Sequence, residues 1–161
     1  MGGKTCSVAE GESDEGAPLR VLLVEDDPDH AELVKRGLAE CHPNLAVVHI
    51  EDGEAALAYL RGRDASDSPE RPHLILLDLR LPRIDGLEVL REIKASPDLS
   101  DIPCVVLTTS RAEGDMVKAY RLHANSYLVK PGSYESFVAL MAEVERYWLR
   151  QNIRPLPAGA S

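Results

Sequence analysis

The chain has 161 residues, which is enough for one domain with a sizeable buried core. Its formal net charge is −9, and nucleic-acid backbones are bound mainly through Lys and Arg, so this charge argues against a nucleic-acid partner. No apolar run approaches the roughly 20 residues that span a bilayer, and the N-terminus lacks the apolar core of a secretory signal. We therefore expect a cytoplasmic protein with no membrane partner.

The three cysteines, Cys6, Cys41 and Cys104, are far apart and have no close His or Cys companion. A disulfide framework or a zinc site requires pairing or short ligand spacing. The cysteines are therefore predicted to be reduced thiols, as is usual in the cytoplasm.

Residues 1–18 are rich in Gly, Ser and acidic residues, which predicts a disordered acidic N-terminal tail. Beyond them, five apolar runs of strand length are mostly continuous rather than alternating, which is typical of strands covered on both faces. These runs are residues 19–24, 46–50, 73–77, 104–107 and 126–129.

Segments between the runs have the apolar spacing of amphipathic helices. The last of them carries a stripe of Phe137, Met141, Val144 and Trp148, at i, i+4, i+7 and i+11. Residues that favour helix starts precede these segments. They are Asp27 followed by Pro28, Asp52, Ser133, and the capping-box pairs Asp85 with Glu88 and Ser110 with Glu113.

Strand and helix therefore alternate five times, which predicts an α/β fold with a parallel sheet and right-handed crossovers. We expect a flavodoxin-like, doubly wound, five-stranded sheet of order 2-1-3-4-5 with helices on both faces. The predicted domain covers residues 19–150, with a polar loop at 62–72 and a loose C-terminal tail at 151–161.

Polar residues follow the ends of four predicted strands. They are Glu25 and Asp26 after the first, Asp78 after the third, Thr108 after the fourth and Lys130 after the fifth. Ligands of doubly wound sheets bind beyond the carboxyl ends of the strands, so these side chains should converge on one pocket. Taken alone, each has a simpler explanation as a helix cap, a turn residue, a strand edge or a solvated charge; their joint placement favours a site.

Three carboxylates in one pocket repel one another, since two unit charges 4 Å apart cost about 4 kcal/mol at an effective dielectric of about 20. A cation is therefore required, and hard oxygen ligands with room for water favour Mg²⁺. A carboxylate beside such an ion can attack a phosphoryl group, while a lysine neutralises the phosphoryl charge and a hydroxyl donates to it. Asp78, Lys130 and Thr108 can fill these roles.

Four segments closely resemble the receiver domains of two-component response regulators, the CheY-like family, within a resemblance that covers about residues 19–148. These segments are VLLVEDDP at 21–28, LLDLRLPRIDG at 76–86, VLTTS at 106–110 and YLVKP at 127–131. By this resemblance Asp78 would be the phosphoacceptor. Mg²⁺ would be held by Asp26, Asp78 and the backbone carbonyl of Arg80, with Glu25 acting through water.

The resemblance also implies the parts of a switch. Thr108 and Lys130 would contact the phosphoryl group, and the ring of Tyr127 would follow the Thr108 hydroxyl. The Lys130–Pro131 peptide bond would be cis, a rare state that usually marks a tight turn.

Within the family, the segments around 106–113 and 122–131 and the Tyr147-Trp148 ending look most like the single-domain regulators paired with bacterial phytochromes. This likeness implies a sensor histidine kinase, a bacteriophytochrome, as phosphodonor, and an unidentified downstream protein. It also implies a homodimer whose candidate interface is Tyr147, Trp148, Leu149 and Ile153. The alternative for Trp148 is that it completes the core stripe of the last helix.

Two other classes of function compete with this interpretation. A phosphohydrolase with an aspartate nucleophile also forms an aspartyl phosphate, but the haloacid-dehalogenase pattern has a second Asp where this chain has Arg80. A scaffold that is never phosphorylated would not require the complete pocket. We therefore predict a signalling protein rather than an enzyme, one that accepts a phosphoryl group on Asp78 and acts through protein contacts.

Overall fold

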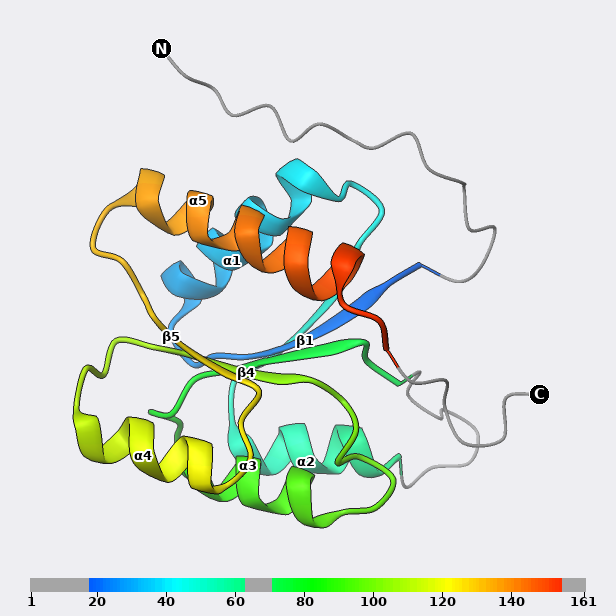
Figure 1. The fold of residues 1–161 in the computed structure, drawn as a ribbon, viewed down its shortest axis with the longest axis vertical. Coiled ribbons are helices and arrows are strands. Elements are labelled where there is room, and N and C mark those ends of the chain that lie inside the picture. The colour runs from blue at the N-terminus through cyan, green and yellow to red at the C-terminus, as the bar shows by residue number, and fades with distance from the viewer. Residues whose placement is uncertain (1–17, 63–70, 155–161) are drawn as a thin grey trace.

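The computed structural model describes residues 18–62 and 71–154. These residues contain one parallel five-stranded sheet of order β2-β1-β3-β4-β5, which confirms the predicted topology (Figure 1). The strands are β1 (Arg20–Val24), β2 (Ala46–Ile50), β3 (Leu74–Leu77), β4 (Cys104–Thr108) and β5 (Ser126–Val129). Residues 1–17 of the predicted N-terminal tail, 63–70 of the predicted loop and 155–161 of the predicted C-terminal tail lie outside the described residues.

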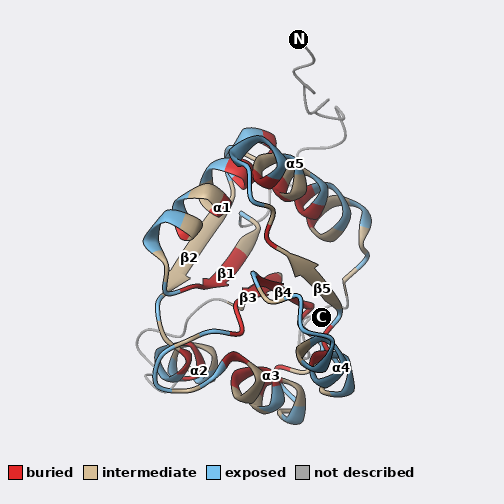
Figure 2. Cartoon of the chain, turned by 90° about the vertical axis from the view of Figure 1, so that its left-hand side faces the viewer, coloured by how far each residue is buried: buried red, intermediate tan, exposed pale blue. Residues whose placement is uncertain are grey.

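Helices cover both faces of the sheet (Figures 1 and 2). On one face lie α1 (Pro28–Cys41) and α5 (Tyr134–Val144), and on the other lie α2 (Gly53–Arg61), α3 (Gly86–Ala95) and α4 (Glu113–Arg121). Successive strand residues point to opposite faces, so Leu22 and Val24 join the core under α2 and α3, whereas Val21 and Leu23 join the core under α1 and α5. Both faces are buried, which explains the continuous apolar runs.

The side chains of the residues that precede α1, α2 and α5 cap these helices, as predicted. The Asp27 carboxylate accepts hydrogen bonds from the backbone N–H groups of Asp29 and His30, at 2.9 and 3.3 Å. Asp52 accepts from the N–H of Ala55, and the Ser133 hydroxyl accepts from the N–H of Ser136.

The two predicted capping boxes are wrong. Asp85 precedes α3 without a side-chain cap hydrogen bond. The residue that precedes α4 is Ala112, because the hydroxyl of Ser110 is used elsewhere: it donates to Asp115 Oδ2 at 2.5 Å and accepts from the Ala112 N–H.

The C-terminal helix changes its period after Val144. Residues Glu145–Gln151 form a π-helical segment, η1, in which hydrogen bonds run from i to i+5. The wider turn places Leu149 rather than Trp148 on the buried face, so Leu149 is only 3% exposed and Trp148 packs partly buried against the same core. The prediction that Leu149 belongs to a surface interface is therefore wrong. The predicted loose tail at 151–161 is also wrong at its first residue, because residue 151 belongs to η1.

A buried ion pair accompanies η1 and was missed in the sequence. The carboxylate of Glu145 is 1% exposed and lies 2.5 Å from Arg150 Nε and 3.5 Å from His42 Nδ1. Arg150 also donates to the carbonyl of Cys41 at 2.7 Å, which joins η1 to the end of α1.

The cysteine prediction is wrong in part. Cys41 is disulfide-bonded, whereas Cys104 is a free, buried thiol whose pKa burial raises to about 12. Cys6 lies outside the described residues. Sequence spacing gave no sign of the bond, because a disulfide requires proximity in space only. Separately, none of the described helices is long and apolar enough to cross a membrane.

Candidate functional site

The carboxyl ends of β1, β3, β4 and β5 bring the predicted polar residues together. Carboxylate oxygens of Glu25, Asp26 and Asp78 all lie within 4.8 Å of one another. Asp78 and Glu25 are buried and Asp26 is exposed, so the cluster opens to solvent through Asp26. The predicted convergence of the acidic side chains is therefore confirmed.

Lys130 neutralises part of this negative charge. Its Nζ lies 2.6 Å from Glu25 Oε2 and 2.9 Å from Asp78 Oδ2, with side chains that are at most 7% exposed. One ammonium therefore serves two buried carboxylates, and Asp26 adds a third negative charge nearby. The remaining negative charge and the all-oxygen donor set fit a divalent cation such as Mg²⁺.

The protonation of Glu25 reflects this crowding. The pKa of Glu25 is raised to about 7, mainly by burial and also by the charge of Asp78, while the hydrogen bond from Lys130 opposes the rise. The carboxyl of Glu25 therefore gains or loses its proton near neutral pH.

A close backbone approach fixes the loop after β3. A Cβ on Gly86 would lie 2.2 Å from the carbonyl oxygen of Asp78, so only glycine fits there. The N–H of Gly86 donates to the carbonyl of Leu79 at 3.0 Å, and the N–H of Arg80 donates to Asp78 Oδ1 at 3.2 Å. These contacts orient the Asp78 carboxylate from its own loop.

Thr108 and Tyr127 meet at the loop after β4. The Thr108 side chain is fully buried, and its Oγ1 accepts from the N–H of Ser110 at 3.3 Å. The Tyr127 hydroxyl donates to the carbonyl of the same Ser110 at 3.0 Å. The two predicted switch residues thus contact one residue of one loop.

Arg80 extends toward this loop. Its Nη2 lies 3.5 Å from Asp115 Oδ2, the oxygen that also accepts from the Ser110 hydroxyl, and the Arg80 side chain is 72% exposed. The loops after β3 and β4 are therefore linked by one carboxylate.

The predicted cis Lys130–Pro131 bond is wrong for this structure. Residues 18–62 and 71–154 contain no cis peptide bond. The trans form is favoured by about 0.5–1 kcal/mol even before proline.

His30 was missed as a site residue. Its Nδ1 lies 2.9 Å from Lys130 Nζ, although the two residues are 100 positions apart. Its place in the first turn after Asp27, next to the acidic pair, was the only signal in the sequence.

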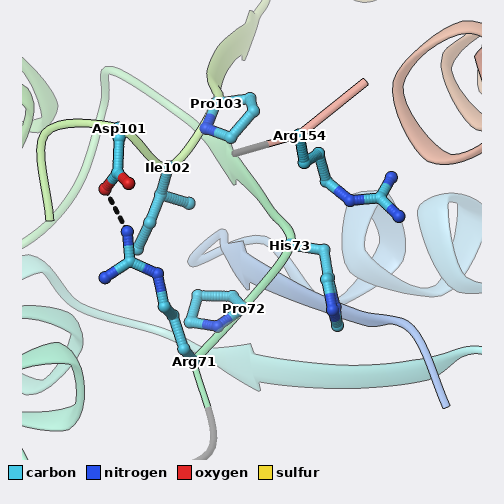
Figure 3. A pocket seen from close by; sticks show the side chains of 7 residues that line it. All are labelled: Arg71, Pro72, His73, Asp101, Ile102, Pro103 and Arg154. Carbon is cyan, nitrogen blue, oxygen red and sulfur yellow. Dashed lines mark hydrogen bonds and ion pairs between the residues drawn. The ribbon is translucent and has the colours of Figure 1, made fainter. Parts of the chain in front are cut away.

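A second pocket lies at the amino-terminal ends of the central strands, where residues 71–73 lead into β3 and 101–103 lead into β4 (Figure 3). Arg154 reaches it from the end of the described chain, and Arg71 pairs with Asp101. None of the predicted site residues lines this pocket.

A doubly wound sheet with an acidic pair after β1, an aspartate after β3, a hydroxyl at the end of β4 and a lysine after β5 defines the class of phospho-aspartate switch domains. A family model described as the response regulator receiver domain matches residues 21–142. The chain therefore belongs to the response regulator receiver domain family. It is a signalling domain that works as a phosphorylation switch, and a histidine kinase is the partner that this family implies.

Two curated relatives match over most of their length. The "Probable methanogenesis regulatory protein FilR2" of Methanothrix harundinacea is 45% identical over 141 residues, which are 88% of this chain and 90% of that protein. The response regulator Rcp1 of Synechocystis is 44% identical over 138 residues, 85% of this chain and 94% of that protein.

Solved structures agree. The phosphorylated cyanobacterial phytochrome response regulator RcpA matches with a TM-score of 0.83 and 40% identity, over 87% of this chain and all of that one. The Mn²⁺-bound form of Rcp1 matches with a TM-score of 0.81 and 41% identity, over 86% and 100% of the two chains. The bacteriophytochrome response regulator AtBRR matches with a TM-score of 0.65 and 40% identity, over 80% and 95%.

Proposed function

We propose that Asp78 is the phosphoacceptor of this receiver domain and that Mg²⁺ is its cofactor. The observation that carries the proposal is the buried Lys130 ammonium, which bridges Asp78 and Glu25 inside a cluster of three carboxylates. Glu25, Asp26 and Asp78 would hold the ion together with the backbone carbonyl of Arg80. The Mn²⁺-bound structure of Rcp1 supports a divalent metal in a related protein.

The proposed reaction is a phosphoryl transfer. A carboxylate oxygen of Asp78 attacks the phosphorus of the kinase phosphohistidine, the P–N bond breaks, and the donor imidazole leaves with the electron pair. Bound Mg²⁺ supplies positive charge to the phosphoryl oxygens. Lys130 donates to one of those oxygens, and the hydroxyl of Thr108 turns to donate to another.

The same Thr108 movement would start the switch. Thr108 Oγ1 now accepts from the Ser110 N–H, and Tyr127 holds the Ser110 carbonyl. When Thr108 turns to the phosphoryl group, Ser110 loses one of these contacts and the loop before α4 shifts, with Tyr127 following. A downstream protein that prefers one arrangement of this surface would then read the signal.

Acetyl phosphate and Mg²⁺ separate this function from its competitors. A receiver gains the mass of one phosphoryl group and loses it again over time. Sustained phosphate release from many phosphate esters would indicate a phosphohydrolase instead. No mass gain under any condition would indicate a scaffold and would overturn the proposal.

The pKa of Glu25 gives Mg²⁺ binding an expected pH dependence. A proton on a carboxyl of pKa about 7 competes with the ion, so binding is strongest well above pH 7 and weakens as the pH falls through 7. We expect affinity at pH 6 to be about tenfold below that at pH 8. Calorimetric titration measures this, with Glu25→Gln as the control that binds more weakly but loses most of the pH dependence. Equal affinities for the wild type at the two pH values would contradict the assignment.

Arg80 is expected to influence the lifetime of the phosphorylated state. Its guanidinium lies against Asp115, and its 72% exposed side chain has room to turn toward a phosphoryl oxygen. Phospho-Asp78 in Arg80→Ala should therefore decay at a rate that differs by about two- to fivefold from the wild type, the value expected for one exposed charged contact. Arg83→Ala, which removes a similarly exposed arginine, is the control. Equal half-lives for Arg80→Ala and wild type would remove this role.

We further propose that a phytochrome histidine kinase is the phosphodonor. The support is that RcpA and AtBRR, both at 40% identity, are described as phytochrome and bacteriophytochrome response regulators. A purified phytochrome kinase should transfer its phosphoryl group to this chain at least tenfold faster than a kinase of another sensor class. Equal rates would argue against the pairing.

The cytoplasmic location stays a prediction. The disulfide bond of Cys41 removes the support that reduced cysteines would have given it.

Finally, we propose a homodimer formed through the exposed part of the C-terminal segment. Tyr147 is 52% exposed and packs edge-on against Trp148 at 5.0 Å between ring centroids, and Ile153 is 94% exposed. Combining Tyr147→Ala with Ile153→Ser should convert a dimer into a monomer in light scattering, since both side chains would leave an apolar interface. Tyr134→Ala, an equally exposed tyrosine at the start of α5, is the control. An unchanged mass for the double variant would end the proposal.

A further inference from the structure

The ammonium of Lys130 has three hydrogens and three acceptors in the structure. Two acceptors are the carboxylates of Glu25 and Asp78, at 2.6 and 2.9 Å, and the third is Nδ1 of His30, at 2.9 Å. A charged lysine only donates, so Nδ1 of His30 must accept through its lone pair. The geometry therefore requires a neutral His30 ring with its proton on Nε2.

The backbone of His30 is fixed within α1, and its ring packs against α5. Its backbone N–H donates to the capping carboxylate Oδ1 of Asp27 at 3.3 Å, which fixes the His30 backbone in the first turn of α1. On its other side the ring packs against Phe137 of α5, with ring centroids 6.4 Å apart and planes tilted by 31°. Phe137 is 2% exposed, so the His30 ring lies against a buried side chain of α5.

His30 differs from the other two acceptors of Lys130 in its charge and in its place outside the carboxylate cluster. Glu25 and Asp78 are the residues whose charge and partners change when the site takes up a cation and a phosphoryl group, because both belong to the carboxylate cluster. His30 is neutral and does not belong to this cluster. Its contact with Lys130 is therefore the one that can persist through the reaction.

We propose that His30 is a positioning residue whose Nδ1 holds the Lys130 ammonium in place while the carboxylate partners of that ammonium change. This inference rests on the proposed role of Asp78 as phosphoacceptor. With one hydrogen anchored on His30, the other two ammonium hydrogens point toward Glu25 and Asp78, where the incoming phosphoryl oxygens would lie. Loss of the anchor leaves the four-carbon side chain of Lys130 free to swing within the pocket.

Two substitutions separate the hydrogen bond from packing. His30→Asn keeps an acceptor close to the position of Nδ1, whereas His30→Leu has a similar shape and no acceptor. With acetyl phosphate and Mg²⁺, His30→Leu should accept the phosphoryl group about tenfold more slowly than the wild type, as expected for one hydrogen bond to a charged group. His30→Asn should stay within about threefold of the wild type. Thermal unfolding of both variants controls for stability.

Each outcome decides the matter. If His30→Leu reacts as fast as the wild type, or if His30→Asn is as slow as His30→Leu, the positioning role is overturned. If the wild type itself gains no phosphoryl group, the proposed role of Asp78 fails instead. The contact can then still be tested by the nitrogen NMR signals of the His30 ring at neutral pH: the inference requires the proton on Nε2, and a proton on Nδ1 would overturn it.

Discussion

Replacing Asp78 by Asn is expected to abolish phosphorylation by acetyl phosphate or a kinase. The amide has the shape of the carboxylate but is not a nucleophile toward phosphorus. The change also removes one of three crowded negative charges, so the variant should be at least as stable as the wild type, and loss of phosphorylation cannot then be attributed to unfolding. Intact-mass measurement after incubation with acetyl phosphate and Mg²⁺ records the result.

The control for this experiment is Asp85→Asn. Asp85 is an exposed aspartate before α3 whose side chain makes no cap hydrogen bond, so its replacement should leave phosphorylation unchanged. A phosphoryl adduct that forms on Asp78→Asn at the wild-type rate would contradict the assignment of Asp78.

Replacing Lys130 by Met has the largest expected effect on stability. Methionine has a similar length but carries no charge, so Glu25 and Asp78 would remain buried without their cation. Removal of one partner from a buried ion pair costs about 3–5 kcal/mol. Chemical denaturation at pH 8 without divalent metal measures this loss, and Lys118→Met, an exposed lysine on α4, is the control.

The destabilisation should depend on pH and on metal. The folded-state pKa of Glu25 is already raised to about 7, and without Lys130 it should rise further. A carboxyl with a raised folded pKa favours folding below its unfolded pKa and loses this contribution as the pH rises through the folded pKa. Lys130→Met should therefore be less destabilised at pH 5 than at pH 8, and Mg²⁺ should raise its melting temperature more than that of the wild type. Equal stability of variant and wild type at pH 8 would refute the ion-pair account.

The convergence of Glu25, Asp78, Thr108 and Lys130 could be predicted from the sequence because it depends on topology alone. Each residue ends or directly follows an apolar strand, and parallel strands of order 2-1-3-4-5 bring their carboxyl ends together. No knowledge of side-chain packing is needed for that step.

Features that depend on packing could not be predicted. The contact of His30 with Lys130 depends on how the first turn of α1 lies against the end of β5. The burial of Leu149 depends on a π-helical segment that changes the helical period, and a sequence stripe assumes that the period is constant. Ser110 has the spacing of a cap, but its hydroxyl bonds to Asp115 instead, a choice that only the loop geometry decides.

Reductive trapping of the phosphorylated protein tests the central claim most directly. Borohydride converts an acyl phosphate of aspartate into homoserine, and peptide sequencing then locates the modified position. The account predicts homoserine at position 78 in protein treated with acetyl phosphate and Mg²⁺, and none in untreated protein. Homoserine at Asp26 or at any other carboxylate, with position 78 unmodified, would contradict it.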